Sequence, residues 1–183
     1  MKPLIITTLF FNNKVEEEIA NYNNNDEEEI LFMNPLDRAL LEEEPVYFLD
    51  MFNQGITGVS TRIGEFKELE HLLLSDNMIT TLPSEIYTLK NLKLLDISNN
   101  LLTKISPQIE KLESLEELYL ANNNLSDLPE EIGKLENLEI INIAGNNFTN
   151  QEIEKIKEML PDVKIIYEED NLNFLEDDLE ETN

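Results

Sequence analysis

The sequence predicts an α/β solenoid, a curved stack of repeats with a parallel β-sheet on its concave face and short helical or 3₁₀ turns on its convex side. The first observation is a unit of 23 residues that recurs along the chain of 183, starting at positions 46, 69, 92, 115 and 138. The second is a set of positions that stay apolar in each unit, and the third is an asparagine that recurs at the ninth position. A unit of this length cannot bury its own apolar face, so stacked neighbours must share one continuous core.

The apolar positions of the first half of the unit predict a short strand. The fourth and sixth residues alternate with polar ones, so they point inward from that strand. The first positions are Val46, Leu69, Leu92, Leu115 and Leu138, the fourth are Leu49, Leu72, Leu95, Leu118 and Ile141, and the sixth are Met51, Leu74, Ile97, Leu120 and Ile143.

An asparagine follows the strand where the chain must bend inward. A buried amide at this bend can pair with loop N–H and C=O groups, each of which would otherwise cost about 1–3 kcal/mol. Gln54 departs from the pattern in the first unit. We therefore expect a structural ladder, with no catalytic role, formed by Asn77, Asn100, Asn123 and Asn146.

The second half of the unit predicts a turn that closes the repeat. Pro83 and Pro129 precede this turn, and Ser60 and Ser106 replace them in alternate units. The whole pattern, LxxLxLxxNxLxxLPxxIxxLxx, resembles the leucine-rich repeat family, in the 23-residue type found in intracellular or bacterial proteins. The resemblance covers about two-thirds of the chain, residues 46–149 with their flanks. It implies a protein partner that is bound on the concave strand face.

The two ends of the array need covers, because a terminal repeat would otherwise expose its apolar face. At the C-terminal end, the spacing of apolar residues predicts a helix over 150–160, which Pro161 ends, and then a strand with Val163, Ile165 and Tyr167. We take residues 150–167 as the C-terminal cap. Residues 1–45 are expected to be either an N-terminal cap or a flexible segment, with strands over 4–11 and 30–33 and helices over 15–22 and 36–41.

The charge is large and unevenly distributed. The chain carries 39 acidic and 13 basic side chains, a net charge of −26. Residues 1–45 and 168–183 are denser in charge than the repeats, and residues 168–183 form an acidic tail without a base, either solvated or able to dock as a peptide. Such a chain repels phosphate backbones and anionic lipid surfaces, so we expect neither nucleic acid nor membrane as a partner.

The sequence holds no constellation that predicts catalysis. It has no cysteine and one histidine, and no phosphate-binding loop, nucleophile elbow or zinc-protease motif. His71 falls at a solvent-facing strand position, where a contact role is more common than a catalytic one. We therefore expect no enzymatic activity, no cofactor and no metal site.

The solvent-facing strand positions predict the binding site. These are the second, third, fifth, seventh and eighth positions of each unit, which combine carboxylates with apolar and aromatic side chains. Apolar groups on a solvated face indicate a binding patch, and carboxylates around them would attract a basic partner. The partner-binding residues that we single out are Tyr47, Phe48, Asp50, Glu70, His71, Leu73, Lys93, Leu94, Asp96, Glu117, Tyr119, Ile140 and Asn142.

The leading functional hypothesis is a non-enzymatic, monomeric protein-interaction module whose partner has a basic, partly apolar surface. An alternative is an acidic inhibitor or immunity-type protein that masks a basic active site. A second alternative, a secreted effector or adhesin, depends on the apolar stretch Leu4–Phe11, which follows a single lysine. That stretch is short and no small-residue cleavage site follows it, so we expect a β-strand there and a cytoplasmic protein.

Overall fold

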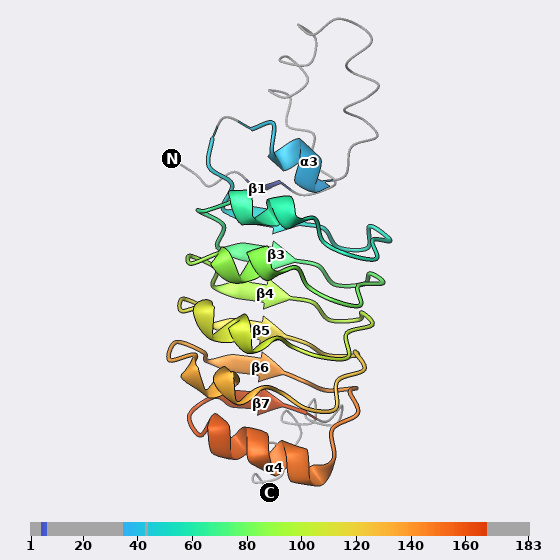
Figure 1. Cartoon of the computed structure of the whole chain (residues 1–183), viewed down its shortest axis with the longest axis vertical. Helices are drawn as coiled ribbons and strands as arrows, with labels where there is room; N and C mark the ends of the chain where they lie inside the picture. The colour runs from blue at the N-terminus through green and yellow to red at the C-terminus, as the bar shows by residue number, and fades with distance from the viewer. Residues whose placement is uncertain (1–4, 7–34, 43, 168–183) are drawn as a thin grey trace, which may run out of the picture.

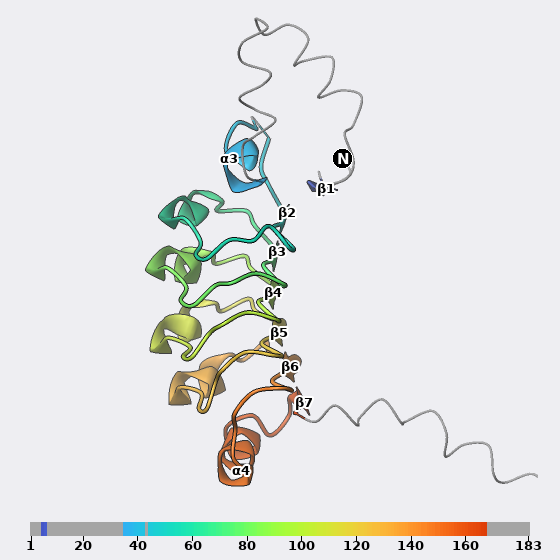
Figure 2. The same cartoon turned by 90° about the vertical axis from the view of Figure 1, so that its right-hand side faces the viewer.

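The fold is a stack of repeats with strands on one side and 3₁₀ turns on the other (Figures 1 and 2). The computed structural model describes residues 5–6, 35–42 and 44–167. Within these ranges, parallel pairing joins seven strands in chain order: β1 (Ile5–Ile6), β2 (Phe48–Asp50), β3 (His71–Leu73), β4 (Leu94–Asp96), β5 (Glu117–Tyr119), β6 (Ile140–Asn142) and β7 (Lys164–Ile166). The predicted solenoid is therefore confirmed.

The core lies between the sheet and the 3₁₀ turns. The central residue of each of β2 to β6 is fully buried and pairs with its counterpart on the next strand, as in Leu49–Leu72 and Leu95–Leu118. The first and sixth positions are buried with it. Burying one leucine side chain contributes about 1.5–3 kcal/mol, and the stack repeats this gain in every unit.

The closing turns are η1 (Thr61–Glu65), η2 (Ser84–Thr88), η3 (Pro107–Lys111) and η4 (Glu130–Lys134). Two different residues begin them. Ser60 and Ser106 accept the backbone N–H of Arg62 and Gln108 at 3.3 and 3.2 Å. Pro83 and Pro129 instead restrict φ to the −70° and −67° that the extended entry needs. The alternation of serine and proline in the sequence thus gives one turn by two means.

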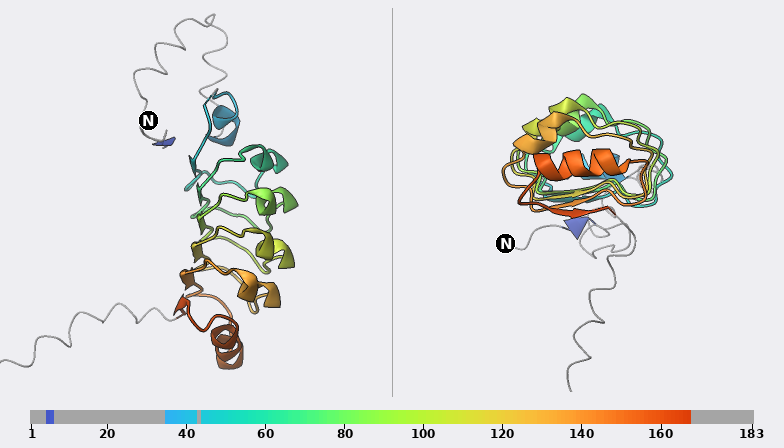
Figure 3. Two further views of the ribbon diagram at one scale, coloured as in Figure 1. Left: turned by 90° about the vertical axis from the view of Figure 1, so that its left-hand side faces the viewer. Right: turned by 90° about the horizontal axis from the view of Figure 1, so that it is seen from below.

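The C-terminal end is closed by α4 (Asn150–Met159), which lies across the end of the stack in the end-on view of Figure 3. Thr149 caps this helix by accepting the N–H of Glu152 at 3.2 Å. Ile153 and Ile156 are buried against the last repeat. The apolar residues of the predicted final strand pack against the core; these are Val163, Ile165 and Tyr167.

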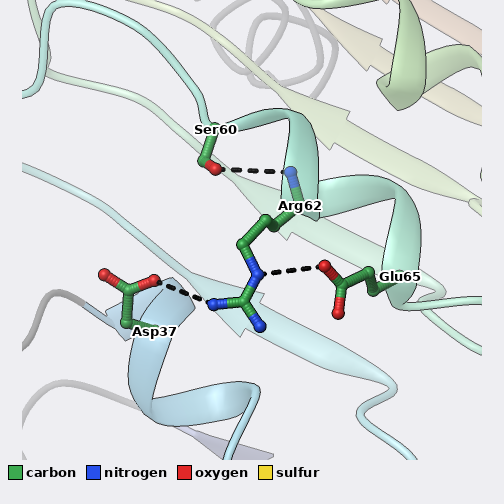
Figure 4. Close-up of polar contacts among 4 residues, drawn as sticks. All are labelled: Asp37, Ser60, Arg62 and Glu65. Atoms are coloured by element: carbon green, nitrogen blue, oxygen red, sulfur yellow. Dashed lines mark hydrogen bonds and ion pairs between the residues drawn. The ribbon is translucent and has the colours of Figure 1, made fainter.

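The N-terminal end is covered by α3 (Pro35–Ala39), near the helix predicted over 36–41. Its Leu36 and Ala39 side chains are buried in the same core, at 1% and 2% exposed. Arg62 joins α3 to η1, because its guanidinium lies 3.8 Å from Asp37 and bonds Glu65 at 3.0 Å (Figure 4).

Part of the predicted N-terminal architecture falls on residues that the structure does not describe. The strand predicted over 4–11 is represented by β1, which pairs Ile5 with Phe48 and Ile6 with Leu49. The helix predicted over 15–22, the strand predicted over 30–33 and the acidic tail 168–183 lie outside the described residues.

Candidate binding face

The parallel register of the sheet places the outward residues of six strands in two rows. The third positions form one row across β2 to β7, and the fifth positions form the other. All are half-buried except Lys164, which is exposed. We call these twelve residues the strand face: Phe48, His71, Leu94, Glu117, Ile140 and Lys164 in the first row, and Asp50, Leu73, Asp96, Tyr119, Asn142 and Ile166 in the second.

Ten of the predicted partner-binding residues lie on the strand face. The other three, Tyr47, Glu70 and Lys93, occupy the second position of their units, directly before the strands. Lys93 pairs with Glu70 across neighbouring repeats at 3.0 Å, so these two charges partly neutralise each other. Glu116 and Glu139 continue the same line and are exposed.

Each strand of the face presents one apolar and one polar or charged residue, and their order alternates from strand to strand. The apolar residue is in the third-position row on β2, β4 and β6 and in the fifth-position row on β3, β5 and β7. One apolar side chain per strand therefore follows a zigzag along the stack. We call this set the apolar ribbon: Phe48, Leu73, Leu94, Tyr119, Ile140 and Ile166.

The polar residues of the fifth-position row also hold the strand ends. Asp50, Asp96 and Asn142 each accept, through Oδ1, the backbone N–H two residues further on, at 2.8, 2.9 and 3.1 Å. Such short polar side chains commonly bond the backbone two residues on. These three predicted contact residues therefore have a local structural role as well, and the carboxylates of Asp50 and Asp96 each already accept one bond within the chain.

Tyr119 and Glu117 form a polar pair on β5. The Tyr119 hydroxyl donates to Glu117 Oε2 at 2.5 Å. This bond, with partial burial and the negative charge of Glu117 and Asp96, raises the pKa of Tyr119 to about 12. The phenol therefore stays neutral and holds its ring on the strand face. At the other end of the face, the rings of Phe48 on β2 and His71 on β3 lie 5.9 Å apart between centroids.

Some seventh positions differ from the prediction, whereas the eighth positions are exposed as expected. Ser75 and Ala144, at the seventh position, are buried rather than solvent-facing, whereas Phe52 is 48% exposed. The eighth position has a left-handed backbone, with φ between 50° and 65° at Asn53, Asp76, Asn99, Asn122 and Gly145. Asparagine, aspartate and glycine tolerate this conformation best, so the residue types there follow from the backbone.

A second ladder of side chains joins these eighth positions. Asn122 donates to Asn99 at 2.8 Å, and Asn99 donates to Asp76 at 3.2 Å. A Cβ at Gly145 would collide with the Oδ1 of Asn122, so a larger residue there would have to displace that side chain. The eighth positions are thus structural.

The predicted asparagine ladder runs through the interior behind the strand ends. Asn100 Nδ2 donates to the carbonyls of Leu74, Ile97 and Ser98 at 2.9–3.2 Å, and its Oδ1 accepts the N–H of Ile79 at 2.9 Å. Asn77, Asn123 and Asn146 repeat these contacts. Gln54 does not join the ladder, since its side chain donates to Phe52.

Two residues of the strand face, Lys164 and Ile166, were missing from the predicted set. The unit before them contains α4 in place of a 3₁₀ turn, so the 23-residue spacing fails and β7 follows β6 by 24 residues. The signal was nevertheless present. Because Val163, Ile165 and Tyr167 alternate with the residues between them along the predicted strand, packing of the first set inward places Lys164 and Ile166 outward.

The described residues show no arrangement suited to catalysis on this face. Two shallow hollows of about 310 and 340 Å³ lie elsewhere, one beside Glu154 and Glu158 on α4 and one between α3 and Phe66. No group of three or more metal-ligating side chains occurs in the part of the chain that the structure describes. Over the same part, no helix has the length and apolar character needed to cross a bilayer.

Comparisons with known proteins agree with this architecture. Among solved structures, a leucine-rich repeat protein of Leptospira interrogans is similar over 73% of this chain and 33% of that one, with 35% identity and a TM-score of 0.68. The ectodomain of the receptor kinase SOBIR1 from Arabidopsis thaliana is similar over 66% of this chain and 68% of that one, with 27% identity and a TM-score of 0.53.

An internalin of Listeria monocytogenes shares the fold, at 22% identity and a TM-score of 0.53, over 61% of this chain and 32% of that one. The chain thus spans about a third of the length of the Leptospira protein. A search of the curated proteins found no significant match.

The family comparison settles what kind of module this is. The leucine-rich repeat region family matches residues 46–166. Modules of this kind generally act as scaffolds for protein–protein interaction and are typically non-catalytic. From the family match and the similar structures, the chain belongs to the leucine-rich repeat proteins.

Proposed function

We propose that this protein is a non-enzymatic binding module that holds a basic, partly apolar protein partner on its strand face. The observation that carries the proposal is the apolar ribbon, which has one half-buried apolar side chain on each of six neighbouring strands. Half-buried leucine, isoleucine and tyrosine side chains gain further burial when a partner covers them, and aromatic anchors often dominate such interfaces.

The charge around the ribbon supports a basic partner. Glu70, Glu116 and Glu139 border it at the second positions, and Glu117 lies within it. Lys93 is paired to Glu70, which leaves the face negative. Negative potential on a binding face speeds encounter with a positive partner and disfavours an acidic one.

A pair of charge substitutions on the ribbon tests the proposal. Leu94→Lys and Tyr119→Lys together place two cations in the centre of the face, beside Asp96 and Glu117, which can accommodate them. We expect affinity purification from the native source to lose the partner, with affinity falling roughly tenfold or more, the loss that removal of central anchors produces.

The matched control adds the same charge to the same two repeats away from the face. Thr103 and Ser126 are exposed and hold equivalent positions beyond the asparagine ladder. Thr103→Lys with Ser126→Lys should retain the partner. Equal capture by the two double variants, with both folded by circular dichroism, would show that the strand face is not the binding site.

The expected cytoplasmic location and monomeric state remain proposals of the same kind. Cell fractionation tests the location, and sedimentation of the purified chain at low and high salt tests the monomer. A chain with net charge −26 repels its own copies, which favours the monomer.

A further inference from the structure

The geometry of the apolar ribbon points to a particular shape of partner, and this inference rests on the proposed function. Neighbouring strands lie about 4.8 Å apart, so the six strands β2 to β7 carry the ribbon over about 24 Å. Its members alternate between the third-position and fifth-position rows. An occupant that covers the whole ribbon must therefore run along the stack. Its apolar groups must alternate between two sides and recur at about the spacing of the strands.

We propose that the strand face binds an amphipathic α-helix whose axis runs along the stack, across the strands. A helix with a heptad stripe presents an apolar residue about every 5.3 Å, alternately on the two sides of the stripe. The difference from the strand spacing is about 0.5 Å per step, which side-chain rotamers absorb over the length of the ribbon. About 16 residues of helix span it.

An extended segment fits the ribbon poorly. Its side chains on one face recur about every 6.7 Å, so it falls out of step with the strands by about 2 Å at each one. Lying across the strands, it also leaves its backbone N–H and C=O groups without sheet partners, which costs free energy wherever water is excluded. A helix satisfies its backbone groups internally and has no such cost.

The two borders of the ribbon differ in charge and size. On the side where the strands begin, Glu70, Glu116 and Glu139 border it. On the side where the strands end, Ser98 and Ala121 are small and Asn99 and Asn122 are neutral, while Phe52 and Asp76 are exposed at the N-terminal end of this border. The helix that fits therefore carries lysine or arginine along one flank and small or polar residues along the other.

The charge also argues against occupants from the same protein. A second copy would bring another negative face, and residues 168–183 contain eight acids and no base. Like charges across a desolvated interface disfavour both. The occupant is thus a basic amphipathic helix of another protein.

Two synthetic peptides test the shape directly against the full chain. One, of about 18 residues, has leucines in a heptad pattern and lysines along one flank. The other has the same composition with a leucine at every second residue. We expect the heptad peptide to bind roughly tenfold or more tightly by fluorescence anisotropy, to gain helical circular dichroism on binding, and to lose roughly tenfold with the Leu94→Lys, Tyr119→Lys protein.

Equal or tighter binding of the alternating peptide overturns the inference. Binding of neither peptide overturns it as well. A third contrary result is that the Thr103→Lys, Ser126→Lys control weakens binding of the heptad peptide as much as the face variant does. The control adds the same two charges, so it separates contact with the ribbon from general attraction to an acidic protein.

Cross-linking of the captured native partner separates failure of this inference from failure of the proposed function. A photoreactive residue replaces Leu73, Leu94 or Ile140 in turn, with Thr103 as the control site. Partner residues spaced by three or four for each strand crossed, and so by about seven between Leu94 and Ile140, support a helix. A spacing of two overturns the helix while the face remains the binding site. Cross-linking no stronger than from Thr103 overturns the proposed function and the inference with it.

Discussion

At the scale of single residues, buried amides hold the stack together. Each ladder asparagine bonds both its own repeat and the preceding one, as Asn100 does with Ile97 and Leu74. The ladder therefore links neighbouring repeats at the bend where the backbone leaves the sheet and has no strand partner.

Asn100→Ala should lower the free energy of unfolding by about 1–3 kcal/mol, because the Ile79 N–H loses its partner in the interior, whereas the Leu74 carbonyl still accepts from Asn77. Urea denaturation measures the difference. The matched control is Asn124→Ala, an exposed asparagine in the next repeat, which should change stability by no more than about 0.5 kcal/mol. Similar losses from both variants would contradict the ladder's role.

The Tyr119–Glu117 pair predicts a late tyrosine titration. Since its pKa is raised from 10.0 to about 12, the neutral phenol is favoured in the folded chain. The stability that this bond contributes is fully present below pH 10 and is lost as the pH rises towards 12.

The measurement is tyrosinate absorbance against pH, compared with Tyr119→Phe to isolate the signal of this residue. Glu117→Gln removes the charge that accepts the bond, so the pKa of Tyr119 should fall towards its ordinary value. A Tyr119 transition near pH 10 in the unsubstituted protein would refute the pairing.

At the scale of elements, α4 replaces the missing neighbour of the last repeat. Ile156 is 1% exposed, so Ile156→Ala should cost about 2–5 kcal/mol. Since each repeat contacts only its neighbours, hydrogen exchange should rise first at β6 and η4 and least at β3 and β4. Glu158→Ala, on the exposed side of the same helix, is the control. A uniform rise along the array would show that α4 is not a local cover.

The elements were predictable to the extent that they repeat. The strand, the asparagine bend and the 3₁₀ turn follow from positions that recur, and the helix over 150–160 follows from its own apolar spacing. The sequence shows that serine replaces proline before alternate turns, but it does not show how. Ser60 begins its turn with a hydrogen bond, whereas Pro83 does so with a fixed φ. The structure shows that these two means produce the same 3₁₀ turn.

At the scale of the molecule, the binding face was predicted in composition but not in arrangement. The outward positions of β2 to β6 followed from strand alternation. The zigzag did not, since it depends on which residues the register places side by side, and Lys164 and Ile166 enter it through a spacing of 24 rather than 23 residues. The eighth positions, such as Asn99, are exposed as predicted, but polar residues at a strand end do not reveal the positive φ that they adopt.

The alternation of the repeats limits how such an array can change length. Units with Asp50 or Asp96 at the fifth position and serine before the turn alternate with units that have Leu73 or Tyr119 and proline. Duplicating one unit would set two like strands side by side. Where the unit carries Asp50 or Asp96, this would bring two carboxylates to about 4.8 Å spacing, and it would break the zigzag of apolar residues. Duplicating a pair of neighbouring units keeps like carboxylates apart and keeps the zigzag of apolar residues. The unit by which such an array can be lengthened without changing its face is therefore the pair of repeats.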